Sequence, residues 1–119
     1  MRADNLLLAA TLLTLSACAS AMKGQSVPVL LANAAAQDGT RVTVHGRLIA
    51  DHGFINLYSP DRRQCLGLLV FEESKRLYLH RDHRVVTVEG RLQAEGCGRE
   101  GMCVEQLCGP AILRDVELR

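Results

Sequence analysis

The stretch RVTVHGRL at residues 41–48 returns as VVTVEGRL at residues 85–92, with six of eight positions identical. In both copies valine and leucine alternate with polar residues, which is the pattern of a half-buried β-strand. Each copy places a glycine, Gly46 or Gly90, where an inward aliphatic side chain is expected. Such a glycine marks a bend, a bulge or a close backbone approach. We therefore expect two strands that bend in the same way. A duplicated fold is the alternative, which the unmatched flanking sequences disfavour.

The segments around the repeats predict two helices and three more strands. Residues 26–39 form a short helix in this prediction, because Ser26 can cap it, Pro28 suits its first turn and Gly39 can end it. Apolar or alternating segments predict strands, and acidic residues at the start of another segment favour a short helix. These further elements are the strands 54–58, 65–71 and 111–118, the last with Ile112, Arg114, Val116 and Leu118 on one side, and the helix 72–80.

The order of these elements resembles the OB-fold, a five-stranded Greek-key barrel. The residues that carry the likeness read LLANAAAQDGTRVTVHGRL, GFINLYSPD and VVTVEGRL. They resemble the OB domains of small bacterial exported proteins and lipoproteins, which are related in pattern to tRNA-anticodon-type OB modules. The resemblance covers residues 28–118. It implies a mainly β domain in which the two repeats pair antiparallel and strand 65–71 lies beside strand 111–118.

The N-terminus resembles a bacterial lipoprotein signal peptide over residues 1–17. Its ten-residue apolar run is too short to span a bilayer, which takes about 20 residues. The run ends in LSAC, which resembles the lipobox whose cysteine, here Cys18, receives the lipid. An ordinary signal peptide cut at residues 19–21 is the alternative.

The resemblance to lipoproteins implies a location in the bacterial cell envelope. The membrane would be contacted through the lipid on Cys18, followed by a tether over residues 18–26 and one domain over residues 27–119. Ala19 directly after the cysteine favours the outer membrane, with the domain facing the periplasm. Removal of residues 1–17 takes away one charge of each sign and leaves the net charge at +1. A nearly neutral domain disfavours nucleic acid as the partner.

Four cysteines remain after lipidation, and an even number in an exported protein predicts two disulfides. We favour Cys97–Cys103, which brackets a glycine-rich turn, together with Cys65–Cys108. The OB resemblance supports the second pair, because it places the strands near these two cysteines side by side. A zinc site made of all four thiolates is the alternative. The 31, 5 and 4 intervening residues fit zinc-site spacing only once.

The best ligand-site candidates lie on and after the segment 54–58. Alternation places Phe54, Asn56 and Tyr58 on the face opposite to the inward side chains, and Arg62 and Arg63 follow in the next turn. Aromatic rings beside arginines are typical of surfaces that stack on single strands, and OB-folds bind their ligands on this face. The alternative is structural, with Phe54 packed under the N-terminal helix and Tyr58 covering an end of the barrel.

No residue pattern in the sequence predicts catalysis. There is no nucleophile elbow, no phosphate-binding loop and no dinucleotide fingerprint. The run His80-Arg81-Asp82-His83 indicates a solvated loop more than a metal site, so we expect neither a cofactor nor a metal. The expected function is therefore a non-catalytic binding module for an envelope protein or a glycan. The alternatives are an OB domain that binds single-stranded nucleic acid and an envelope protein that binds a metal.

Overall fold

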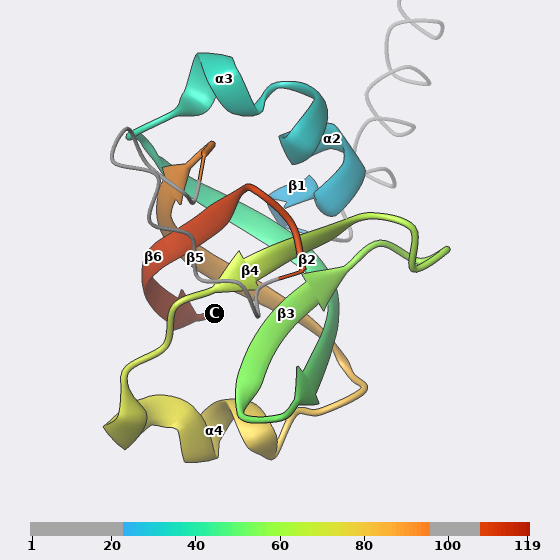
Figure 1. Cartoon of the computed structure of the whole chain (residues 1–119), viewed down its shortest axis with the longest axis vertical. Coiled ribbons are helices and arrows are strands. Elements are labelled where there is room, and N and C mark those ends of the chain that lie inside the picture. Colours follow the sequence, from blue (N-terminus) through green and yellow to red (C-terminus); the bar gives the residue numbers. More distant parts are fainter. Residues whose placement is uncertain (1–22, 96–107) are drawn as a thin grey trace, which may run out of the picture.

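The computed structural model describes residues 23–95 and 108–119. Within these residues the chain is mainly β, as predicted, with short helices between the strands (Figure 1). No helix in this part of the chain has the length and apolar character that crossing a membrane requires. The elements in chain order are β1 (Gln25–Ser26), α2 (Val27–Ala32), α3 (Ala34–Gln37), β2 (Arg41–Asp51), β3 (Phe54–Tyr58), β4 (Cys65–Leu68), the 3₁₀ turn η1 (Glu72–Ser74), α4 (Lys75–Leu79), β5 (Val85–Gln93) and β6 (Ile112–Leu118).

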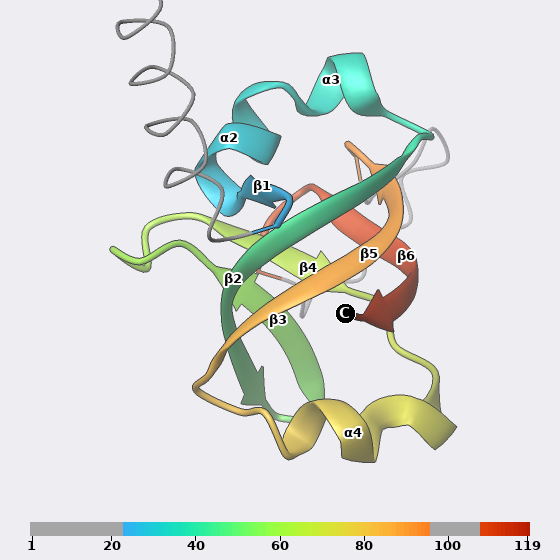
Figure 2. The ribbon, with the colours of Figure 1, turned by 180° about the vertical axis from the view of Figure 1, so that it is seen from behind.

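The described strands form one sheet whose ends meet. Their order is β1-β2-β3-β4-β6-β5, and β2 also pairs with β5. Strands β2 to β6 therefore close into a ring, while the two-residue β1 adds to β2 in parallel. Helices α2 and α3 lie at one end of this ring and α4 at the other (Figures 1 and 2).

The two copies of the repeated phrase are antiparallel neighbours, in β2 and β5, as predicted. Val44 lies directly opposite Val88, so each copy meets the other at the same position of the phrase. Gly46 lies opposite Val86, and by the same register Gly90 lies opposite the equivalent valine of β2. The repeat thus reflects a symmetric pairing, in which each strand places the same residue types opposite the equivalent positions of the other strand.

Both glycines of the repeat let a third strand approach closely. A Cβ on Gly46 would lie 2.8 Å from the carbonyl oxygen of Tyr58, and a Cβ on Gly90 would lie 2.7 Å from that of Arg114. Real Cβ atoms essentially never come so near to another backbone. Of the three features that such a glycine can mark, a bend, a bulge or a close backbone approach, the close approach is present at both positions.

The predicted helix over residues 26–39 is present in two pieces. It begins as expected, because the Ser26 hydroxyl oxygen accepts a hydrogen bond from the Val29 N–H at 3.3 Å. It breaks at Asn33, whose side-chain amide donates to the Val29 carbonyl at 3.1 Å while its backbone leaves helical geometry. Gly39 follows α3 with φ +78°, a conformation that glycine adopts without strain.

The strand predicted over residues 65–71 ends earlier, at Leu68. Phe71 is 64% exposed and serves as the residue that precedes η1, so its backbone belongs to the next turn. The predicted helix over residues 72–80 is present as η1 followed by α4. Its side chain Tyr78 is buried, and its hydroxyl donates to the Val116 carbonyl at 3.2 Å.

The prediction for residues 111–118 is wrong about which side chains share a face. Asp115 has φ +51°, and the register with β5 shifts at this point. This irregularity changes the phase of the alternation, so Leu113 before it and Val116 after it both contact the core, whereas Arg114 is exposed. The shift lies beside the point where Gly90 in β5 closely approaches the backbone of Arg114.

The ring is filled by aliphatic side chains from every strand of the ring and from α2. No large ring other than that of Tyr78 belongs to this cluster, which matches the few aromatics in the chain. Its fully or nearly fully buried members are Val27, Leu30, Val42, Val44, Leu48, Ile55, Leu57, Leu66, Leu68, Tyr78, Val86, Val88, Leu92, Ala111 and Leu113.

Candidate functional site

The outer surface of β3 carries the three side chains predicted to form a ligand face. Ile55 and Leu57 point into the core and are 2% and 0% exposed. Strand alternation therefore turns Phe54, Asn56 and Tyr58 outward, as predicted. Phe54 and Tyr58 are half-buried rather than fully packed, so their rings are partly open to contact.

These three side chains line one hollow of about 370 Å³, here called the β2–β3 hollow. Its floor comes from two paired strands, because Ile49 lies opposite Asn56 and Asp51 lies opposite Phe54. Among the described residues, the lining consists of Ile49, Asp51, His52, Phe54, Asn56, Tyr58 and Cys108. Two aromatic rings, an amide, a carboxylate and an imidazole thus meet at one place.

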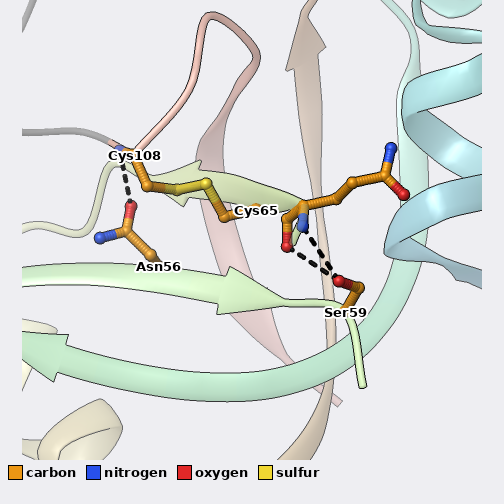
Figure 3. Close-up of a disulfide and its surroundings, with 5 residues drawn as sticks. Asn56, Ser59, Cys65 and Cys108 are labelled. Atoms are coloured by element: carbon orange, nitrogen blue, oxygen red, sulfur yellow. Dashed lines mark hydrogen bonds between the residues drawn. A yellow bond between two sulfur atoms is a disulfide. The ribbon is translucent and has the colours of Figure 1, made fainter. Parts of the chain in front are cut away.

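Asn56 is the most buried polar side chain of this face, at 5% exposure. Its side-chain oxygen accepts a hydrogen bond from the backbone N–H of Cys108 at 3.4 Å (Figure 3). Cys108 in turn forms a disulfide with Cys65, which lies opposite Tyr58 in β4, and the two Cα atoms are 6.0 Å apart. This is one of the two pairings favoured from the sequence, and it fixes one wall of the hollow to β4.

The rim of the hollow at the other end is the tight turn between β2 and β3. His52 and Gly53 both have positive φ, at 51° and 82°, which is the geometry of a two-residue hairpin turn. The ring nitrogen Nδ1 of His52 contacts a carboxylate oxygen of Asp51, and both side chains are exposed. A ligand in the hollow would meet a hydrogen-bonding pair at this rim.

Arg62 and Arg63, the other two predicted ligand candidates, lie on an exposed turn and do not line the hollow. The turn is organised by Asp61, whose carboxylate accepts hydrogen bonds from the Ser59 hydroxyl at 2.7 Å and from the Arg63 N–H at 3.1 Å. These two bonds, the first above all, lower the pKa of the Asp61 carboxyl. The same Ser59 hydroxyl oxygen also accepts from the N–H of Gln64 (Figure 3).

Sequence reasoning missed three residues of this site, because Ile49, Asp51 and His52 also line the hollow. Arg47 lies opposite Tyr58 in the β2–β3 pairing but is not part of this lining. The signal was available, because continuing the alternation of residues 41–48 places Arg47, Ile49 and Asp51 on the outer face. Predicting that His52 lines the hollow would also have required knowledge of the type of turn between β2 and β3.

The histidines do not gather. His45 contacts the Lys23 carbonyl, His52 contacts Asp51, and His83 contacts Asp82. Within residues 23–95 and 108–119, no group of three or more histidine, cysteine, aspartate or glutamate side chains could hold a metal ion.

Cys18, Cys97 and Cys103 lie outside the residues that the structure describes, so lipidation and the Cys97–Cys103 pairing remain predictions. No protein-family model matches the chain, and searches of curated proteins and of solved structures found no match either. The chemistry of the β2–β3 hollow is what bears on function. Partly open rings beside fixed polar groups can bind and orient a ligand.

Proposed function

We propose that residues 27–119 form a five-stranded OB-fold barrel that works as a non-catalytic binding module. In support, β2 to β6 follow one another around the ring in the order β2-β3-β4-β6-β5, with β2 and β5 closing it. The antiparallel β2–β5 pair and the parallel β4–β6 pair are the two contacts that the OB resemblance implies. The two-residue β1 is then an addition to the barrel.

The ligand site of this module is the β2–β3 hollow. The observation that carries the proposal is the convergence of Phe54, Asn56 and Tyr58 in one hollow on the outer surface of β3. OB-folds take oligosaccharides and oligonucleotides on the corresponding face. The position of the hollow and the OB-fold resemblance thus both favour the outer surface of β3 as the binding surface.

A glycan strand of the cell envelope is the partner that this chemistry favours. The hollow lies at the lower end of the range of about 300–1,000 Å³ for small-molecule sites, so it suits individual sugar rings better than a large protein surface. Asp51, His52 and Asn56 offer acceptors and donors for hydroxyl groups, and the two aromatic rings offer apolar faces. The Asp51 carboxylate would repel the phosphate backbone of a nucleic acid. The near-neutral charge of the chain also gives little electrostatic attraction to such a backbone.

The proposed location is the outer membrane, with the domain facing the periplasm. Lipidation of Cys18 would anchor the chain, and strand β1 of the folded domain starts seven positions later in the sequence, at Gln25. A short tether of this kind would hold the hollow close to the membrane and to the glycan layer beside it.

Sedimentation of the mature protein with insoluble envelope glycan tests the function. We expect wild type to co-sediment and Phe54→Ala and Tyr58→Ala each to weaken binding about tenfold or more, because each removes a ring from the hollow. Phe71→Ala is the matched control, since Phe71 is 64% exposed and does not line this hollow.

Three results would contradict parts of this proposal. Equal binding by Phe54→Ala, Tyr58→Ala and wild type would exclude the hollow as the site. Salt-dependent binding to a single-stranded oligonucleotide without glycan binding would favour the nucleic-acid alternative. A photocrosslinker placed at residue 54 in intact cells that traps one protein instead of glycan would make the partner an envelope protein.

A further inference from the structure

A second hollow, of about 230 Å³, lies at the other end of the same strands, here called the α2 hollow. The start of α2, the middle of β2 and the end of β3 surround it, and Tyr58 is a wall that it shares with the β2–β3 hollow. Its lining consists of Ser26, Val27, His45, Gly46, Arg47, Tyr58, Pro60 and Val85.

The interior of the α2 hollow is apolar. Val27, Pro60, Val85 and the Tyr58 side chain form most of its wall. Val85 is 51% exposed, so an aliphatic side chain stands at the opening with much of its surface in water. Gly46 keeps the bottom tight, because a Cβ there would lie within 3.0 Å of atoms of Leu57 and Tyr58 in β3 and of Val27 in α2. An apolar ligand would remove this surface from water, at about 25 cal/mol per Å².

The charged side chain beside this apolar interior is that of Arg47. The His45 ring lines the hollow with it, and within the part of the chain that the structure describes no carboxylate does. One guanidinium nitrogen of Arg47 donates to the His83 carbonyl, which holds the side chain in place. The His45 ring is held by a contact with the Lys23 carbonyl at 3.2 Å. An oriented guanidinium recognises a carboxylate through paired hydrogen bonds.

We propose that the α2 hollow binds a small amphipathic anion, an apolar chain of about eight carbons or fewer that ends in a carboxylate. The chain would lie against Val27, Pro60 and Val85, and the carboxylate would meet Arg47. This site is separate from the glycan site and does not depend on it, except that Tyr58 contributes to both.

Titration of the mature protein with octanoate, followed by amide NMR and by calorimetry, tests the site. We expect saturable shifts at Gly46 and Val85, with no comparable shifts at Leu77 and Leu79, the exposed apolar side chains of α4. Acetate has the same charge without the chain, and octan-1-ol has the same chain without the charge. Each should bind at least tenfold more weakly than octanoate.

Variants separate the two halves of the recognition. Arg47→Gln should weaken octanoate binding about tenfold and leave octan-1-ol binding unchanged, whereas Val85→Ser should weaken both. His45→Gln keeps the bond from Arg47 to His83 and removes the imidazole ring from the lining. It therefore tests the polar side of the hollow in case Arg47→Gln fails to fold, and we expect it to weaken octanoate binding severalfold. Phe54→Ala, in the other hollow, should bind octanoate like wild type.

The proposal is overturned if octanoate causes no saturable shift at Gly46 and Val85, or if octan-1-ol binds as tightly as octanoate. It is also overturned if folded Arg47→Gln and His45→Gln both retain full octanoate affinity. If the wild-type protein binds octanoate but no envelope glycan, the proposed function is wrong and this inference is unaffected.

Discussion

Gly46 and Gly90 show at the scale of single residues why the repeated phrase must contain a glycine. Each is buried, and a Cβ placed on either glycine would lie less than 3 Å from a backbone oxygen of a third strand. An aliphatic residue would continue the alternation better, but it would push the crossing strand away. The missing side chain is therefore what lets β2 and β5 contact their other neighbours while they pair with each other.

Gly46→Ala should lower the free energy of unfolding by about 1–3 kcal/mol, the usual cost of overpacking a tight site. Its Cβ would collide with the Tyr58 carbonyl oxygen and with Val27. Urea denaturation measures the change. Thr43→Ala, a neighbouring substitution on the outer face of β2, is the control and should cost less. A Gly46→Ala variant as stable as wild type would show that the strands are farther apart than described.

Asp82 ties the loop before β5 to the end of β2. Its carboxylate accepts a hydrogen bond from the Ala50 N–H at 2.8 Å, and this bond, together with the nearby His83, lowers the pKa of the carboxyl. A lowered pKa in the folded state stabilises the fold above the unfolded pKa of about 3.9. This contribution is lost as the pH falls through the folded-state value.

Asp82→Ala should therefore be less stable than wild type at pH 7, and the difference should shrink as the pH falls below about 4. Urea denaturation at several pH values gives the two curves. Glu73→Ala, which removes an exposed carboxylate from η1, is the control and should show no such convergence. A stability difference that is constant down to pH 2 would mean that the charge of Asp82 plays no part.

At the scale of elements, the Cys65–Cys108 disulfide connects β4 to the residues that lead into β6. It spans 43 positions of the chain. The same Cys108 donates its N–H to Asn56 at the floor of the β2–β3 hollow. The crosslink therefore braces the ring and holds one wall of the candidate site.

The double variant Cys65→Ala/Cys108→Ala should lower the free energy of unfolding by about 4 kcal/mol on the chain-entropy estimate for a loop of this length. Chemical denaturation of the oxidised proteins measures this. Glycan binding should also weaken in the fraction that stays folded, because the wall at Cys108 is released. A loss below about 1 kcal/mol with binding intact would show that the crosslink supports neither the ring nor the site.

The elements that sequence reasoning predicted well are those set by local pattern. Strict alternation predicted the inward and outward faces of β3. The pairing of β2 with β5 is not a local pattern and was implied by the OB-fold resemblance. The errors arose where non-local contacts or a single backbone angle decide the outcome. Asp115 reverses the phase of β6 through a positive φ, and Asn33 breaks a helix by a hydrogen bond to its own preceding turn.

The candidate site was predictable only in part for the same reason. Phe54, Asn56 and Tyr58 follow from the period of one strand, whereas Asp51 and His52 reach the hollow through the geometry of a turn. Arg62 and Arg63 were expected beside the aromatic rings because they are near in sequence. The turn made by Asp61 leaves them outside the lining, and Arg47 is the arginine opposite Tyr58.

At the scale of the whole molecule, a sheet that closes on itself leaves little room inside for a ligand, because aliphatic side chains fill it. A ligand would therefore have to bind on the outside of the ring. The two hollows described above lie along the outer surfaces of β2 and β3 and share Tyr58. The account depends on this outer surface being the working face of the protein.

The most direct test is an amide NMR titration of the mature protein with soluble fragments of envelope glycan. The account predicts saturable shifts at Phe54, Asn56 and Tyr58, with Leu77 and Leu79 on α4 unchanged. Amide shifts confined to α4 would contradict the account. So would the absence of any shift at glycan concentrations that saturate co-sedimentation.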